Sequence, residues 1–283
     1  MADLKLFNQT ITNVKTQEYL EGVLGEKKQA FVNNLTALVS NDKGLQACEP
    51  TTLMFAALKA TALDLPLDNN LGFAYVIPFK DNKLGKTVAT FMCGYKGITQ
   101  LAIRSGQFKT INVTDVREGE LKGRNRMTGE LSFEWIEDDA VRCKLPIIGY
   151  VGYFKLLSGY SKTTYWSVEE LKQHGVKYSQ TYKKGCGVWA DNFEQMCRKT
   201  VIKLMLNKGD APMSVEMQQA IKYDQSVILD EDGRYEYVDN KPKLSAAEQA
   251  AQFLEQQGGR NVEDVDLVPE EHQEGSNLFE GKE

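Results

Sequence analysis

The spacing of apolar residues changes sharply early in the chain. Over Lys15–Ser40, and again from Pro50 onward, apolar residues recur every three or four positions, which predicts two helices with Pro50 in the first turn of the second. The second helix should stop shortly before Pro66, because proline disfavours helical geometry in the residue that precedes it. Two strand-like segments follow, Phe73–Phe79 and Thr87–Cys93, on either side of a polar loop. Helices that precede an antiparallel hairpin indicate a mixed architecture of helix and sheet.

The rest of the chain continues to alternate between the two patterns. Tyr95–Ser105 has helical spacing again, and the clearest helix runs over Val188–Lys208. Ser167 and Glu170 have the spacing of a capping box, which predicts a short helix to about Gln173. Further elements are expected as strands at 108–116, 131–136, 141–144, 150–157 and 163–166, a loop at 174–187 and a helix at 214–223. The sequence therefore predicts an α+β fold: N-terminal helices, a β-hairpin and an antiparallel β-meander backed by a long helix, and a flexible acidic C-terminal region.

The net charge of −5 hides an uneven distribution. From Asp230 to the end the chain has 15 acidic and 5 basic residues, whereas residues 1–229 have 24 acidic and 29 basic ones. A basic body with an acidic tail is typical of nucleic-acid-binding proteins, with the tail acting as a competitor or as a contact for other proteins. In the tail we expect one helix near Leu244–Gln257 and a terminal element at Asn277–Phe279.

Several kinds of chemistry are disfavoured by what the sequence lacks. Gly85-Lys86-Thr87 resembles the end of an ATP-binding phosphate loop, but Lys80 stands where that motif requires glycine. Five scattered cysteines without a CxxC pair, and two histidines, argue against a zinc site or a disulfide framework and fit a reducing cytosol. The chain also has no apolar run long enough for a membrane span, and no signal-peptide pattern at its start. We therefore expect no cofactor, no membrane contact and a cytoplasmic location.

A metal-dependent nuclease is one alternative. Asp64 and Asp68, or the run Glu137–Asp139, could supply carboxylates to a catalytic metal ion. The simpler interpretation is that the first pair flanks a helix end and that the acidic run is a solvated turn between strands.

Two stretches are rich in basic residues. Lys80–Arg126 has ten Lys and Arg against four Asp and Glu, and Lys172–Lys208 has eight against two. Cations near aromatic rings suit single-stranded nucleic acid, because cations contact phosphates and flat rings stack on bases. The alternative is that these lysines are only solvated. The candidate DNA contacts are Lys96, Arg104, Lys109, Arg117, Arg124 and Arg126 in the first stretch, and Lys177, Tyr178, Lys183, Lys184, Arg198, Lys199, Lys203 and Lys208 in the second.

The long predicted helix should have one apolar and one basic face. At about 100° per residue, Phe193 and Leu204 fall on the apolar face. Arg198, Lys199 and Lys203 fall on the opposite side. We therefore expect these three cations to point outward together.

Two blocks of sequence resemble the RecT family of phage single-strand annealing proteins. The first is LDLPLDNNLGFAYVIPF at Leu63–Phe79, followed by GYKGITQLA at Gly94–Ala102. The second consists of Trp189, Phe193 and MCRKTV at Met196–Val201, with the following Leu204. The likeness extends from about Phe31 to Gln225, with the elements in the family's order.

The resemblance implies that the protein binds single-stranded DNA and anneals complementary strands without ATP, in phage-type homologous recombination. It also implies a homo-oligomer, a ring or a helical filament, that holds the single strand and the annealed duplex in a basic groove. By matching positions it carries over Lys96, Arg198, Lys199 and Lys203 as DNA contacts.

The same reasoning divides the chain into two parts. We expect residues 1–225 to form a DNA-binding and oligomerising annealing domain, and residues 226–283 to form a linker and the acidic tail. A phage exonuclease and a host single-strand-binding protein are the expected partners of the tail. The main alternative to annealing is a DNA-binding adaptor without annealing activity.

Overall fold

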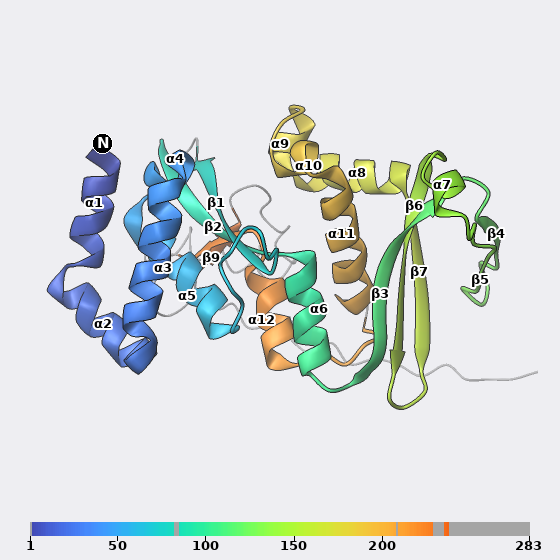
Figure 1. The fold of residues 1–283 in the computed structure, drawn as a ribbon, viewed down its shortest axis with the longest axis horizontal. Coiled ribbons are helices and arrows are strands. Elements are labelled where there is room, and N and C mark those ends of the chain that lie inside the picture. The colour runs from blue at the N-terminus through green and yellow to red at the C-terminus, as the bar shows by residue number, and fades with distance from the viewer. Residues whose placement is uncertain (1, 82–84, 208, 229–234, 238–283) are drawn as a thin grey trace, which may run out of the picture. The chain divides into compact units, whose positions relative to one another are not determined.

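The computed structural model describes residues 2–81, 85–207, 209–228 and 235–237 (Figure 1). Within these ranges the protein consists of helices and antiparallel sheets, which confirms the predicted α+β class. No helix in the described part of the chain is long and apolar enough to cross a membrane. The elements predicted at 244–257 and 277–279 lie outside the described residues.

The chain begins with a group of helices. The side chain of Asn13 accepts a hydrogen bond from the Lys15 N–H at the start of α2, and that of Asp42 accepts two at the start of α4. Pro50 occupies the first turn of α5, as predicted. The single helix predicted over 15–40 is interrupted by a 3-10 turn. The elements are α1 (Ala2–Ile11), α2 (Val14–Leu24), η1 (Gly25–Lys27), α3 (Lys28–Asn41), α4 (Lys43–Gln46) and α5 (Pro50–Ala62).

The first sheet contains the predicted hairpin. Its strands are β1 (Ala74–Asp81), β2 (Lys86–Cys93), β8 (Ser226–Ile228) and β9 (Tyr235–Tyr237), in the order β1-β2-β8-β9. Helix α5 packs on β2, where the Ala89 N–H donates to the Thr52 hydroxyl at 2.9 Å. Strand β8 lies where the sequence predicted the start of a linker. It is only three residues long, and it pairs with a strand more than a hundred residues earlier in the chain, at Phe91.

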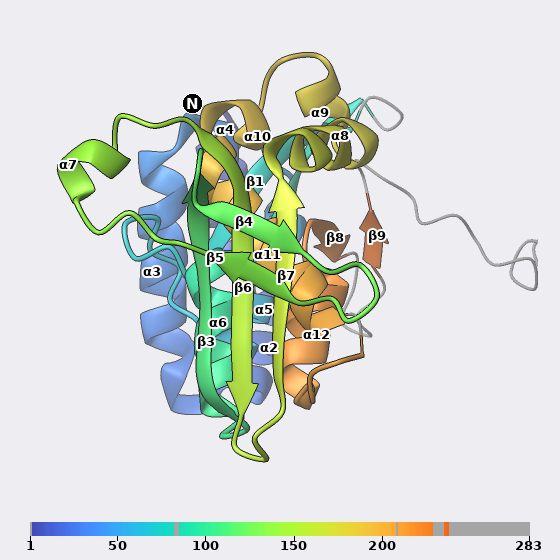
Figure 2. The ribbon, with the colours of Figure 1, turned by 90° about the vertical axis from the view of Figure 1, so that its right-hand side faces the viewer.

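The second sheet is the predicted meander. Its order is β3-β6-β7, from β3 (Phe108–Arg117), β6 (Ile147–Leu156) and β7 (Ser161–Ser167). A two-stranded ribbon, β4 (Leu121–Arg124) with β5 (Leu131–Phe133), is inserted between β3 and β6 and crosses in front of β6 and β7 (Figure 2).

Three helices lie between the two sheets: α6 (Tyr95–Arg104), α11 (Phe193–Asn207) and α12 (Val215–Tyr223) (Figure 1). Helix α11 contacts both α6 and the meander, and it approaches β6 closely at Gly152, where an added Cβ would lie 2.9 Å from Met205 Sδ. Its buried residues therefore extend around most of the helix: Met196, Cys197, Lys199, Thr200, Val201, Ile202, Met205 and Leu206.

Three further local predictions differ from the structure. Instead of the strand predicted at 141–144, residues 141–142 end α7 (Asp139–Arg142) and residues 143–144 form a turn, because the Asp138 side chain caps a helical turn by accepting from the Ala140 and Val141 N–H groups. The capping box of Ser167 and Glu170 is confirmed, but its helix α8 (Val168–Tyr178) extends into the predicted loop, and α9 (Gln180–Lys183) follows. The helix predicted over 188–208 is divided at Asn192 into α10 (Val188–Asp191) and α11.

Candidate nucleic-acid interface

Two adjoining cavities lie between the β1–β2 hairpin and the helices α9–α11. The larger has a volume of about 430 Å³ and the smaller about 120 Å³. Both are lined by Ile77 and Met92 of the hairpin and by Val188 of α10, so the two cavities lie side by side. We call the two cavities together the hairpin groove.

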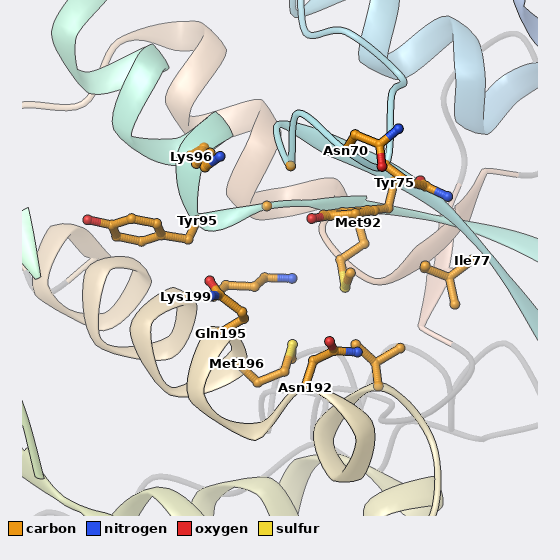
Figure 3. A pocket seen from close by; sticks show the side chains of 14 residues that line it. Asn70, Tyr75, Ile77, Met92, Tyr95, Lys96, Asn192, Gln195, Met196 and Lys199 are labelled. Atoms are coloured by element: carbon orange, nitrogen blue, oxygen red, sulfur yellow. The ribbon is translucent and has the colours of Figure 1, made fainter. Parts of the chain in front are cut away.

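The larger cavity has two facing walls (Figure 3). Tyr75 and Met92 project from the hairpin, and Met196 and the stem of Lys199 project from α11. Partial burial raises the pKa of the Tyr75 hydroxyl, so the ring remains neutral at physiological pH. Lys96, in the first turn of α6, is exposed and lies at the edge of this cavity.

Two glycines of the GYKG segment let the loop before β1 pack closely against the start of α6, at one end of the groove. A Cβ at Gly94 would overlap the carbonyl oxygen of Gly72, and a Cβ at Gly97 would overlap that of Phe73. The Gly94 N–H donates to the Phe73 carbonyl at 2.9 Å. The loop that carries the groove residues before β1 is therefore held directly against the start of α6.

Replacing Gly97 with alanine should lower the free energy of unfolding by about 1–3 kcal/mol, because the backbone at Phe73 must move to admit the methyl group. Gly22→Ala is the matched control. Gly22 lies within α2 with nothing within 4 Å of the added Cβ, so that variant should be neutral or slightly stabilised. Urea denaturation of both variants measures the difference. Equal midpoints would show that the close packing of Gly97 does not matter.

The structure corrects the expected position of two lysines of α11. Lys199 is buried, and its Nζ donates to Asp224 Oδ1 at 2.7 Å, while Lys203 Nζ donates to Asp224 Oδ2 at 2.8 Å. Asp224 Oδ1 also accepts the Cys93 N–H at 3.1 Å. Burial alone would raise the pKa of Asp224, but the two ammonium groups outweigh it and hold that pKa below its ordinary value. Lys199 is thus held inside the protein, and Lys203 is paired with the same carboxylate while remaining partly exposed.

The third cation of that helix, Arg198, also turns inward. Its guanidinium donates to Asp115 Oδ1 at 3.2 Å, and Asp115 is shared with Arg117 and Arg142. Burial would raise the pKa of Asp115, but hydrogen bonds and charge from the arginines lower it overall. The prediction that Arg198, Lys199 and Lys203 point outward together is therefore wrong, since neighbouring elements cover α11 on the side that a helical wheel shows as polar.

Arg117 and Arg104 have structural partners as well. Arg117 donates to Asp115 and to the Leu145 carbonyl. Arg104 donates to the carbonyls of Leu63 and Asp64 at 3.0 and 2.8 Å, just after the end of α5.

The remaining predicted contacts fall into two groups. Lys96 borders the groove, and Lys177, Tyr178, Lys183 and Lys184 are exposed on or next to α8 and α9, whose neighbouring residues Ser179 and Thr181 line the smaller cavity. Lys109, Arg124 and Arg126 are exposed on β3, on β4 and in the turn after it, on the opposite side of α11 from the hairpin (Figures 1 and 2). Lys208 lies outside the described residues.

Sequence reasoning missed the polar lining of the larger cavity. Four amide side chains line it, from the loop before β1 and from the junction of α10 and α11: Asn69, Asn70, Asn192 and Gln195. Neutral amides give no signal in a count of charges, although Asn69 and Asn70 lie within the family-like block.

Carboxylates proposed for a nuclease do not gather in the described residues. No group of three or more His, Cys, Asp or Glu side chains is placed to hold a metal ion there. Asp64 pairs with Arg104, and Asp138 caps α7.

A groove with aromatic side chains in its lining and exposed lysines beside it is an arrangement that single-strand-binding proteins use. The chain belongs to the RecT family, whose model matches residues 29–239. It is 37% identical over 230 residues to "Uncharacterized protein YqaK" of Bacillus subtilis (strain 168), covering 81% of this chain and 72% of that protein. It is 28% identical over 228 residues to "Protein RecT" of Escherichia coli (strain K12), covering 75% and 80%. The predicted family is confirmed, and with it a general role in DNA recombination by single-strand annealing.

Proposed function

We propose that the protein binds single-stranded DNA along the hairpin groove and anneals complementary strands without a nucleoside triphosphate. The observation that carries this proposal is the groove itself, which has aromatic and amide lining and Lys96 at its edge, in a chain of the RecT family. The failed match to a phosphate loop at Lys80 supports independence from ATP.

The exposed lysines account for the annealing step. Lys96, Lys183 and Lys184 have no ion-pair partner among the described residues, so they are available to phosphates. Neutralising one strand lowers its repulsion of a second strand, and Watson–Crick pairing then supplies the sequence specificity. In a homo-oligomer, as a ring or a filament, the groove is repeated along one DNA strand. Weak contacts in each subunit then add up to a stable complex.

Self-assembly, cytoplasmic location and partners belong to the same proposal. Binding and assembly would reside in the residues before the acidic tail, as the sequence predicts for 1–225. The tail, with its net negative charge, would contact a phage exonuclease or a host single-strand-binding protein rather than DNA.

The test is annealing of two complementary oligonucleotides, one carrying a fluorophore and the other a quencher, in buffer free of nucleotides. We expect the protein to increase the pairing rate over that of DNA alone, and adding ATP should change nothing. A strict requirement for ATP would overturn the proposal. Binding without faster pairing would favour the adaptor, and shortening of a labelled strand upon addition of magnesium would favour the nuclease.

A further inference from the structure

The four amides of the larger cavity have no internal role that the structure reveals. Asn69, Asn70, Asn192 and Gln195 are exposed and line the same cavity from two elements. Within the described residues, none of their amide groups hydrogen-bonds to another side chain or to the backbone. Each carries both a donor and an acceptor, so together they can satisfy a ligand whose polar edge presents either kind of group.

The walls between these amides are apolar and partly aromatic. Tyr75 and Met92 on the hairpin face Met196 on α11 across the cavity (Figure 3). An aromatic ring and two polarisable thioethers bind a flat, apolar surface well. A volume of about 430 Å³ lies within the usual range for pockets that take small organic groups.

The charges around the cavity decide which part of a nucleotide can enter it. The cation on the cavity wall, Lys199, is buried and its ammonium group already donates to Asp224 at 2.7 Å, so it is not free to turn toward a phosphate inside the cavity. Lys96 stands at the edge, where a phosphate keeps its contact with water. Burying a neutral heteroaromatic base costs little free energy once its polar edge is hydrogen-bonded, whereas burying an anion without a partner costs much more.

We propose that this cavity takes one nucleobase of the bound strand, with the base between the hairpin and α11 and its phosphate on Lys96. This rests on the proposed function, because the base belongs to single-stranded DNA held in the hairpin groove. Amides that donate and accept accommodate any of the four bases, so the pocket binds without reading sequence. The captured base is unstacked from its neighbours and must leave the pocket before it pairs.

The experiment compares wild type with Asn192→Ala/Gln195→Ala on two oligonucleotides of equal length. One carries all its bases, and the other carries abasic residues throughout its central part, which keeps the phosphates. The double variant should bind the complete strand about 5- to 150-fold more weakly, from the loss of two neutral hydrogen bonds. It should bind the abasic strand as tightly as wild type does. The salt dependence should stay unchanged, since no cation is removed.

Gln107→Ala provides the matched control. Gln107 is an exposed amide in the turn between α6 and β3, away from the cavity lining, so its loss should affect neither strand. If the double variant loses affinity equally for both oligonucleotides, the amides contact the DNA backbone. If it loses affinity for neither, no base occupies the pocket. Either result would overturn the inference. In those cases the proposed function still stands if the wild-type protein binds and anneals DNA. If the wild-type protein does not bind DNA, both the proposed function and this inference are refuted.

Discussion

Replacing Asp224 with alanine should lower the free energy of unfolding by about 3–5 kcal/mol, the usual cost of leaving a buried charge without its partner. The side chains of Asp224 and Lys199 are only 1% and 5% exposed, so water cannot replace the lost contact at Lys199. The Cys93 N–H loses its acceptor at the same time. Chemical denaturation of the variant measures the effect.

A surface pair supplies the control. Asp210 lies 3.5 Å from Lys162 with both side chains partly exposed, so Asp210→Ala should cost less than about 1 kcal/mol. A second variant, Lys199→Met/Asp224→Asn, removes the buried charges together and should recover much of the loss, because Lys203 is 28% exposed and can reach water. If Asp224→Ala is no more damaging than Asp210→Ala, the buried pair does not stabilise the fold.

The pKa of Asp224 gives the same interaction a pH dependence. The pKa of Asp224 is lower in the folded protein than in the unfolded chain. The stabilisation is therefore fully present at a pH above the ordinary pKa of aspartate, and it is lost as the pH falls through the pKa of Asp224 in the folded protein. Wild type should therefore lose stability in acid more steeply than Lys199→Met/Asp224→Asn.

Local patterns in the sequence predicted most elements but not their packing. The hairpin and the capping box at Ser167 depend on neighbouring residues, and both are present. Strand β8 depends on pairing between Ser226 and Phe91, which no local window contains. The position of Lys199 likewise depends on Asp224, which follows α12.

The candidate site was only partly predictable for the same reason. Lys96 was found because it lies in a family-like block and remains exposed. The amides were not found, because Asn70 and Gln195 meet only when the hairpin packs near α11. A helical wheel also assumes a single buried face, and that assumption fails for a helix placed between two sheets.

Charge reversal of three exposed lysines in or beside the hairpin groove, Lys96→Glu, Lys183→Glu and Lys184→Glu, should weaken binding to single-stranded DNA by about 10- to 100-fold near physiological salt. Each phosphate contact contributes about 0.7 to the log–log dependence of affinity on salt, so three lost contacts should flatten the slope by about 2. The loss should be similar for every base sequence, because phosphates carry no sequence information. Titrations at several salt concentrations measure both quantities.

The meander side of the protein offers a control with the same change in net charge. Lys109, Arg124 and Arg126 are exposed on β3, on β4 and in the turn after it, on the opposite side of α11 from the hairpin. Their reversal to glutamate alters the overall charge as much as the groove variant does, so it tests whether position or total charge matters. If the strand follows the groove, the meander variant should keep a slope close to that of wild type. A larger loss in the meander variant would move the DNA path to β3 and the β4–β5 ribbon, and equal losses would mean that the strand contacts both sides.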